Sequence, residues 1–168
     1  NFIYDTGSCY FFEKNTSGDW IEMQKAVLSG RLFTNDFFGR SVAISGNIAV
    51  VGKFDRNKAY VFERDNNGVW QETQILTSSN AMLGSFGAFG RNVAIEGNYI
   101  IIGSQDERAG DNTTPTTGAV YIFERSANGT WTEIQRLLAS DGSSGDDFGE
   151  SVAISGDYIV VGALLEDE

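Results

Sequence analysis

The chain has 168 residues, a net charge of −11, and 20 glycines against a single proline. An acidic surface repels phosphate backbones and anionic lipids, so nucleic acid and membrane surfaces are poor partners, and no apolar run reaches the ~18 residues of a membrane helix. The sequence has no histidine and one cysteine, which excludes Ser-His-Asp triads, typical zinc sites and an intrachain disulfide.

The first predicted elements are a pair of strands within residues 7–27. Cys9–Phe12 is an apolar segment, and Trp20 opens a second segment that mixes polar and apolar residues. Both are rich in residue types that strands favour. Cys9 lies inside the apolar segment, so we expect its thiol to be buried and structural.

Two four-stranded units are predicted next, near residues 38–76 and 89–138, followed by one strand pair near residues 148–163. In each, Gly-Asn or Gly-Asp separates the first two strands, which is typical of two-residue hairpins that need positive φ. The second strand is apolar at consecutive positions, as in Tyr99–Gly103 and Tyr158–Gly162. Such a run predicts a strand that is covered on both faces.

These units are copies of one repeat. A ten-residue pattern that begins with Phe-Gly and ends with Gly-Asn or Gly-Asp starts at Phe38, Phe89 and Phe148, in steps of 51 and 59 residues. A second pattern, Tyr-x-Phe-Glu followed by Lys or Arg, also occurs three times, each time with a tryptophan ten residues after its tyrosine. Four short antiparallel strands in each repeat of about 50–60 residues is the organisation of a propeller blade.

The Phe-Gly pairs resemble the FG of FG-GAP repeats, and the triplets at 51–53, 102–104 and 161–163 resemble its degenerate GAP. In these motifs the chain is similar to integrin α-subunit propellers and to extracellular FG-GAP repeat proteins of microbes. The resemblance implies a β-propeller fold and an extracellular or cell-surface location, but no particular ligand, because one fold carries many functions. The residues of the motif are Phe38, Gly39, Phe89, Gly90, Phe148 and Gly149.

The fold prediction is therefore all-β, with propeller blades of four antiparallel strands and three blade equivalents, one of them split between the termini. The units are an outer half-blade over 1–30, blades over 31–82 and 83–141, and an inner half-blade over 142–168. Because closed propellers have about four to eight blades, three should not close. The half-blades would be completed by more of a longer propeller, by another subunit, or by copies joined into a filament.

A metal site is considered for the loop after the second strand of the 83–141 blade, because many FG-GAP blades bind calcium there. Asp106, Glu107 and Asp111 could supply oxygen ligands, whereas Ca²⁺ takes about six to eight of them. Calcium is thus a possible cofactor, and a solvated acidic turn is the alternative interpretation.

Three Asn-x-Ser/Thr sequons fall in predicted loops, at Asn15, Asn112 and Asn128. A loop position is where a glycan could be attached in a secreted protein. Glycosylation at these three residues is therefore a hypothesis.

The sequence contains no recognisable catalytic constellation, and its acidic residues recur at equivalent repeat positions, which is typical of a structural role. We predict that the chain is not an enzyme but an extracellular module for adhesion or structural assembly, with its split blades completed by another segment or subunit. The alternative is a segment of a larger closed propeller, of about six or seven blades, that recognises a protein or a glycan. The first function predicts self-association, and the second predicts a ligand.

Overall fold

The structure is a computed structural model that describes residues 7–28, 37–53, 57–80, 88–107 and 116–166. These residues form twelve strands and no helix, which confirms the all-β prediction. This part of the chain accordingly holds no helix with the length and apolar character needed to cross a membrane. The strands are β1 (Cys9–Lys14), β2 (Trp20–Ala26), β3 (Val42–Ser45), β4 (Ile48–Lys53), β5 (Lys58–Arg64), β6 (Trp70–Leu76), β7 (Asn92–Glu96), β8 (Tyr99–Ser104), β9 (Ala119–Arg125), β10 (Trp131–Leu137), β11 (Phe148–Ser155) and β12 (Tyr158–Ala163).

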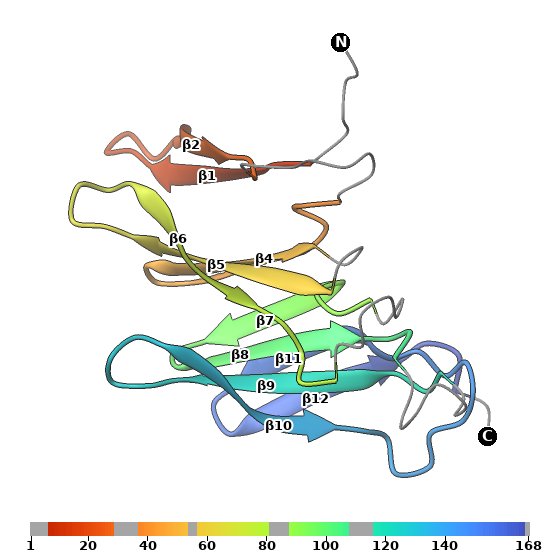
Figure 1. Cartoon of the computed structure of the whole chain (residues 1–168). Coiled ribbons are helices and arrows are strands. Elements are labelled where there is room, and N and C mark those ends of the chain that lie inside the picture. The colour runs from red at the N-terminus through yellow and green to blue at the C-terminus, as the bar shows by residue number, and fades with distance from the viewer. Residues whose placement is uncertain (1–6, 29–36, 54–56, 81–87, 108–115, 167–168) are drawn as a thin grey trace.

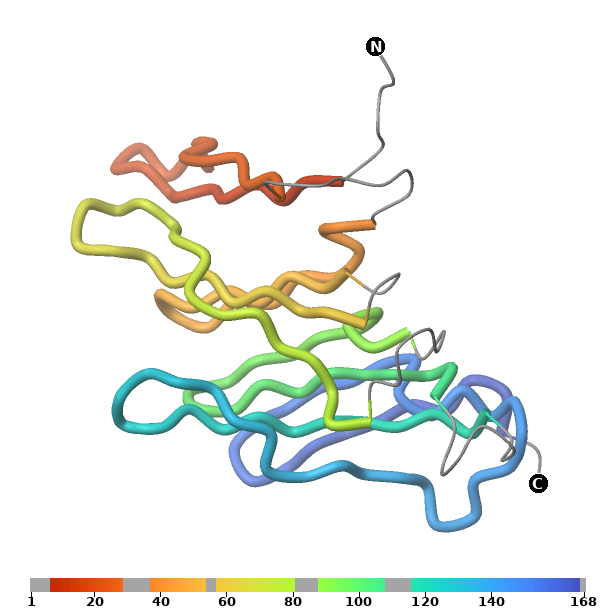
Figure 2. Tube along the Cα trace, viewed as in Figure 1, coloured from red at the N-terminus to blue at the C-terminus, as the bar shows by residue number. Residues whose placement is uncertain are grey.

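The strands form four antiparallel sheets that follow one another in chain order. The first sheet is β1–β2, the second β3–β4–β5–β6, the third β7–β8–β9–β10 and the fourth β11–β12. The sheets are stacked, and the two-stranded first and fourth sheets lie at opposite ends of the stack (Figures 1 and 2). This arrangement is consistent with propeller-like blades, and among the described strands no sheet closes on itself.

The hairpins between the first two strands of the second, third and fourth sheets all turn at a glycine with left-handed backbone. Gly46, Gly97 and Gly156 have φ values of 58°, 55° and 54°. A Cβ on any of them would meet no atom within 4 Å, so the backbone conformation and not crowding selects glycine here. The Gly-Asn and Gly-Asp dipeptides therefore form the hairpins that the sequence predicts.

A β-bulge recurs in the outer strand pair of three sheets. The register shifts between β1 and β2, between β5 and β6, and between β9 and β10, so that Met23, Thr73 and Ile134 are each the extra residue. A bulge re-aims the side chains that follow it. The residue after each bulge is a glutamine, and two of these glutamines link neighbouring sheets, as described below.

Three hydrophobic cores fill the spaces between the four sheets. The strands β4 and β8 contribute to the cores on both of their faces, and Val50, Ile100, Ile101 and Ile102 are completely buried. This confirms for Tyr99–Gly103 the prediction that consecutive apolar residues mark a strand covered on both sides. The same prediction is wrong for Tyr158–Gly162, because one face of β12 is open and Val160 is 68% exposed. Each sheet is thus a layer whose apolar faces need a neighbouring sheet.

Candidate functional site

Each Phe-Gly pair lies at a junction between two sheets. Phe38 and Gly39 come before β3 in a turn, with a φ of 87° at Gly39 and a hydrogen bond from the Arg40 amide to the Phe37 carbonyl. The strand β3 begins three residues later, at Val42. In the third copy of the motif, β11 already begins at Phe148, and the left-handed Gly149 lies where the register with β12 shifts.

At these junctions the backbones of neighbouring sheets approach so closely that only glycine fits. A Cβ on Gly52 would lie 1.9 Å from the carbonyl oxygen of Gly90, and a Cβ on Gly103 would lie 2.1 Å from that of Gly149. At the equivalent glycine of the fourth sheet, Gly162, the side chain and backbone nitrogen of Ser151 are the described atoms that lie within 4 Å of such a Cβ. The chain therefore carries a docking glycine at which no next sheet lies.

The phenylalanine of the motif packs on two aromatic rings of the third strand of its own sheet. Phe89 lies with its ring centroid 5.4 Å from Tyr121 and 6.1 Å from Phe123, and all three side chains are at most 3% exposed. Phe38 contacts the equivalent Tyr60 and Phe62 at 5.5 and 6.3 Å. The motif thus anchors the first strand of a sheet to its third strand through an aromatic cluster.

A glutamine in the outer strand of one sheet binds the backbone of the next sheet at two points. The Gln74 side chain donates to the Trp131 carbonyl at 2.7 Å and accepts from the Trp131 amide at 2.8 Å. Gln24 makes the same two bonds with Trp70, both at 2.8 Å. Since these backbone groups belong to edge strands, the glutamines satisfy polar groups that no strand pairs with.

Ion pairs follow the same periodic arrangement. Arg64 of the second sheet contacts Glu13 of the first at 2.6 Å, and Arg125 of the third contacts Glu63 of the second, also at 2.6 Å. These pairs are partly exposed, so each adds little to stability. Their repetition shows that successive sheets are related by the same rotation and translation.

The first and fourth sheets expose residues whose equivalents are buried in the middle sheets. Trp20 is 69% exposed, whereas Trp70 and Trp131 are 8% and 3% exposed. On β12, Val160 is 68% exposed, whereas Ile101 at the same position of β8 is fully buried. Large exposed apolar patches mark interaction surfaces, so the end sheets are the candidate functional site.

An apolar groove with a volume of about 600 Å³ runs along the open edge of β1 and continues onto β3. Its walls include Tyr10 and Phe12, which are 47% and 54% exposed, and Val42 and Ile44, which are 63% and 61% exposed. Cys9 also lines the groove but is itself only 7% exposed, and burial raises the pKa of its thiol to about 11. This confirms the prediction of a buried thiol, which is protonated at neutral pH.

The structure places two of the three candidate metal ligands, since Asp111 lies outside the described residues. Glu107 is buried, and its carboxylate accepts hydrogen bonds from the Tyr121 hydroxyl and from Asn80 at 3.0 Å, while Arg136 lies at 2.9 Å. Burial and this bond to Glu107 raise the pKa of Tyr121. Tyr121 and Arg136 therefore hold Glu107 against β9 and β10, and Asn80 binds it from the segment after β6.

Asp106 is half-buried next to Asp147, and desolvation followed by the charge of Asp147 raises its pKa. Within the described residues, no group of three or more Asp, Glu, Cys or His side chains could hold a metal ion. The oxygen atoms placed here fall short of the set that Ca²⁺ prefers, and calcium in this loop stays a prediction.

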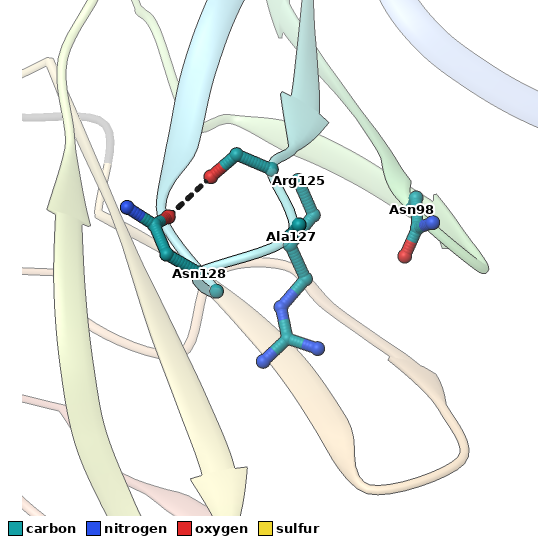
Figure 3. A pocket seen from close by; sticks show the side chains of 6 residues that line it. Asn98, Arg125, Ala127 and Asn128 are labelled. Carbon is teal, nitrogen blue, oxygen red and sulfur yellow. Dashed lines mark hydrogen bonds between the residues drawn. The ribbon is translucent and has the colours of Figure 1, made fainter.

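Two of the sequon asparagines lie in exposed turns, and Asn112 lies outside the described residues. Asn15 accepts from the amides of Ser17 and Asp19, both at 2.9 Å, in the turn between β1 and β2. Asn128 lies in the turn between β9 and β10 and accepts from the Ser126 hydroxyl at 2.5 Å. This turn borders a shallow polar hollow that includes Asn98 and Arg125 (Figure 3). Glycan attachment at these positions stays a prediction.

Sequence reasoning missed the glutamine links and the bulges that aim them. The signal was present, because a glutamine stands four residues after each of the three tryptophans. That spacing alone, however, does not indicate that the glutamine side chain binds the backbone of the neighbouring sheet. The contact becomes visible only when two sheets are seen together.

The comparisons with known proteins agree with the repeat structure. The model of the FG-GAP repeat matches residues 20–62, 70–123 and 131–168, which is most of the chain. Each match begins at the tryptophan of an outer strand and extends into the next sheet. A search among curated proteins finds no match. Since the three matches cover both middle sheets and the fourth sheet, the chain belongs to the FG-GAP repeat family.

Proposed function

We propose that this chain is a non-enzymatic β-propeller module of the extracellular space or cell surface, which serves adhesion or structural assembly. Its two-stranded end sheets are completed by another chain segment or subunit. The observation that carries the proposal is the contrast in burial between equivalent residues, with Trp20 being 69% exposed and Trp131 3%. Open strand edges with apolar faces pair readily with other chains.

The composition of the end sheets supports assembly over simple solubility. The edges of β1 and β12 carry aromatic and branched apolar side chains, among them Phe12, Tyr158 and Val160. Proteins that protect an open edge usually place lysine, proline or inward-pointing charges there. The net charge of −11 opposes association of identical chains, so we expect assembly to strengthen as salt screens the charge.

Sedimentation of the purified 168-residue chain over a range of concentrations tests this proposal. We expect the mass to rise from the 18.3 kDa of one chain to that of two chains or more, and to rise further at higher ionic strength. Acrylamide quenching should fall in parallel, because assembly covers Trp20. A folded chain that stays monomeric at all concentrations and salt levels would contradict the assembly function.

A second candidate function is ligand recognition within a larger closed propeller. It is favoured by the polar hollow of about 550 Å³ beside the β9–β10 turn, which is lined by Asn98, Arg125 and Asn128 among others. Amide and guanidinium groups offer hydrogen bonds that suit a glycan or a polar protein segment. Binding to a glycan array that is lost in Asn98→Ala would support this function, and an array without signal would contradict it for glycans.

A further inference from the structure

We infer that copies of this chain join through one defined antiparallel ladder, in which β12 of one copy pairs with β1 of the next. This inference rests on the proposed assembly function and adds to it the partner, a second copy, and the register of the contact. It is carried by the two complete sheets, which show how the second strand of a sheet meets the third.

The register follows from the ladders that the structure contains. In the third sheet Tyr99 lies opposite Glu124, and Gly103 lies opposite Val120. In the second sheet the equivalent pairs are Ile48 with Glu63 and Gly52 with Ala59. Transferred to the end strands by repeat position, this register sets Tyr158 opposite Glu13 of the second copy, Val160 opposite Phe11, and Gly162 opposite Cys9.

The rim of this ladder has a polar contact ready to form. In the third sheet the hydroxyl of Tyr99 donates to Glu124 at 3.0 Å. Tyr158 is the residue equivalent to Tyr99 and is 78% exposed. In the inferred register its hydroxyl donates to Glu13 of the second copy.

The aromatic cluster of the split sheet is divided between two copies. Phe38 is buried on Tyr60 and Phe62, and Phe89 on Tyr121 and Phe123. The rings that correspond to these tyrosines and phenylalanines on β1 are Tyr10 and Phe12, which are about half exposed.

Phe148 is the remaining phenylalanine of the motif, and it lies at the start of β11 in the fourth sheet. Pairing of β12 with β1 of a second copy therefore brings Phe148 onto Tyr10 and Phe12 of that copy and completes the third aromatic cluster.

The groove along β1 has the lining that the inserted strand requires. In the third sheet, Val93 and Ile95 on β7 pack against the core that contains Val50 of β4. The equivalents of Val93 and Ile95 on β3 are the exposed Val42 and Ile44, which line the groove. Val160 of the first copy is the equivalent of Val50, so it enters the groove of the second copy between these two side chains.

Two backbone contacts would extend the junction beyond the ladder. Gly162 is equivalent to Gly52 and Gly103, so it would lie against the carbonyl of Gly39 in the second copy. Gln135 follows the bulge of β10 as Gln24 and Gln74 follow theirs, and it is exposed. It would bind the backbone of Trp20 in the second copy, as Gln74 binds Trp131.

Cysteine cross-linking tests the register. Glu13→Cys and Tyr158→Cys are prepared as separate variants and mixed under mild oxidation. By analogy with the middle sheets these residues form a pair that is not hydrogen-bonded, in which the Cβ atoms are close. We expect a disulfide-linked dimer in the mixture, at several times the yield of either variant alone, with native Cys9 retained as the baseline.

In the matched control, the Glu13→Cys variant is mixed with an Ile159→Cys variant in place of the Tyr158→Cys variant. Ile159 is the next residue of β12, and its side chain lies on the opposite face, in the core between the third and fourth sheets. Equal yields of dimer from the two mixtures would overturn the inferred register. If sedimentation shows oligomers but the cross-link is absent, the register is wrong while the assembly function stands.

A second variant tests the backbone contact. Gly162→Ala places a methyl group towards Ser151 in its own chain, whose hydroxyl can rotate away, and towards the Gly39 carbonyl in the second copy. We expect the melting temperature of the monomer to change little and the dissociation constant to rise about tenfold or more. Gly142→Ala, where a Cβ meets its nearest atom at 3.4 Å, is the control. Unchanged association of Gly162→Ala would contradict the contact.

Discussion

The two middle sheets and the two end sheets are built from the same repeat but have different surroundings. Ile101 of β8 is completely buried, whereas Val160, at the same position of β12, is 68% exposed. The local strand geometry is the same in both, with the hairpin glycines Gly97 and Gly156 at φ values of 55° and 54°. The comparison teaches that the repeat determines the shape of a sheet, while its neighbours determine which side chains contribute to stability.

The largest difference is expected for side chains in the cores. Ile101→Ala should destabilise the chain by about 2–5 kcal/mol, because it removes buried methyl groups and leaves a cavity. Val160→Ala, at the equivalent exposed position, should change the stability of the monomer by less than about 0.5 kcal/mol. Urea unfolding at a concentration where the chain is monomeric measures both, and equal effects would break the comparison.

A smaller difference is expected for the docking glycines. A Cβ on Gly103 would lie 2.1 Å from the Gly149 carbonyl oxygen, so Gly103→Ala must push two backbones apart and should cost about 1–3 kcal/mol. Gly162→Ala should cost clearly less in the monomer, because among the described residues it is the Ser151 side chain, and no backbone of another sheet, that lies close to the new methyl group. Thermal unfolding of both variants measures the difference. A larger loss in Gly162→Ala would mean that the fourth sheet already has a close neighbour.

The glutamine links should give an effect of intermediate size. Gln74→Ala leaves the amide and the carbonyl of Trp131 without the partners that now lie at 2.8 and 2.7 Å, at a cost of about 1–2 kcal/mol. Gln135→Ala removes an exposed side chain of the third sheet and should stay within about 0.5 kcal/mol. Denaturant unfolding of both variants measures these losses of stability. A large loss in Gln135→Ala would contradict the assignment of Gln135 as an equivalent of Gln74 without a bound partner in the monomer.

The smallest effect is expected from charge at the junction of the third and fourth sheets. Asp106 faces Asp147 and Arg91, and desolvation followed by the charge of Asp147 raises its pKa from 3.8. A raised pKa in the folded state means that the stability from Asp106 is present below pH 3.8 and is lost as pH rises through the higher value.

Asp106→Asn should therefore stabilise the chain at pH 7, by no more than about 0.5 kcal/mol because water screens a half-buried group. The gain should vanish near pH 3, where the protonated Asp106 carboxyl is as neutral as the asparagine amide that replaces it. Melting curves at the two pH values measure it, and the exposed Asp141→Asn is the control. Destabilisation at pH 7 would show that the carboxylate has a partner it needs, such as a bound cation.

Most of the fold could be predicted from the sequence, because the same strand and turn patterns recur in each repeat and confirm one another. The Gly-Asn and Gly-Asp dipeptides located the hairpins, since the left-handed backbone that Gly46, Gly97 and Gly156 adopt is open to few other residue types. The apolar run Ile100–Ile102 identified a strand covered on both faces. The positions of Phe38 and Phe89 marked the sheet junctions, although the pattern did not show that the motif forms a turn ahead of β3 and β7.

The candidate site was harder to predict, because the exposure of a residue depends on whether another sheet packs against it. Trp20 and Trp131 occupy the same place in the repeat, and no local pattern says that one is exposed and the other buried. The surroundings of the acidic residues were equally hidden. The charge of Glu107 makes it a candidate metal ligand in the sequence, and the contacts of its carboxylate with Arg136, Tyr121 and Asn80 involve residues that are distant in the chain.

The sequence repeat and the sheet do not begin at the same strand, and this offset has a mechanical consequence. Because each FG-GAP match begins in the outer strand of one sheet and ends in the next, the sequence repeat and the sheet are offset by one strand. A force applied along the chain must therefore loosen two sheets before it can free one repeat. Such staggering should make forced unfolding proceed in few large steps, and it should make the loss of a single repeat costly to both of its neighbours.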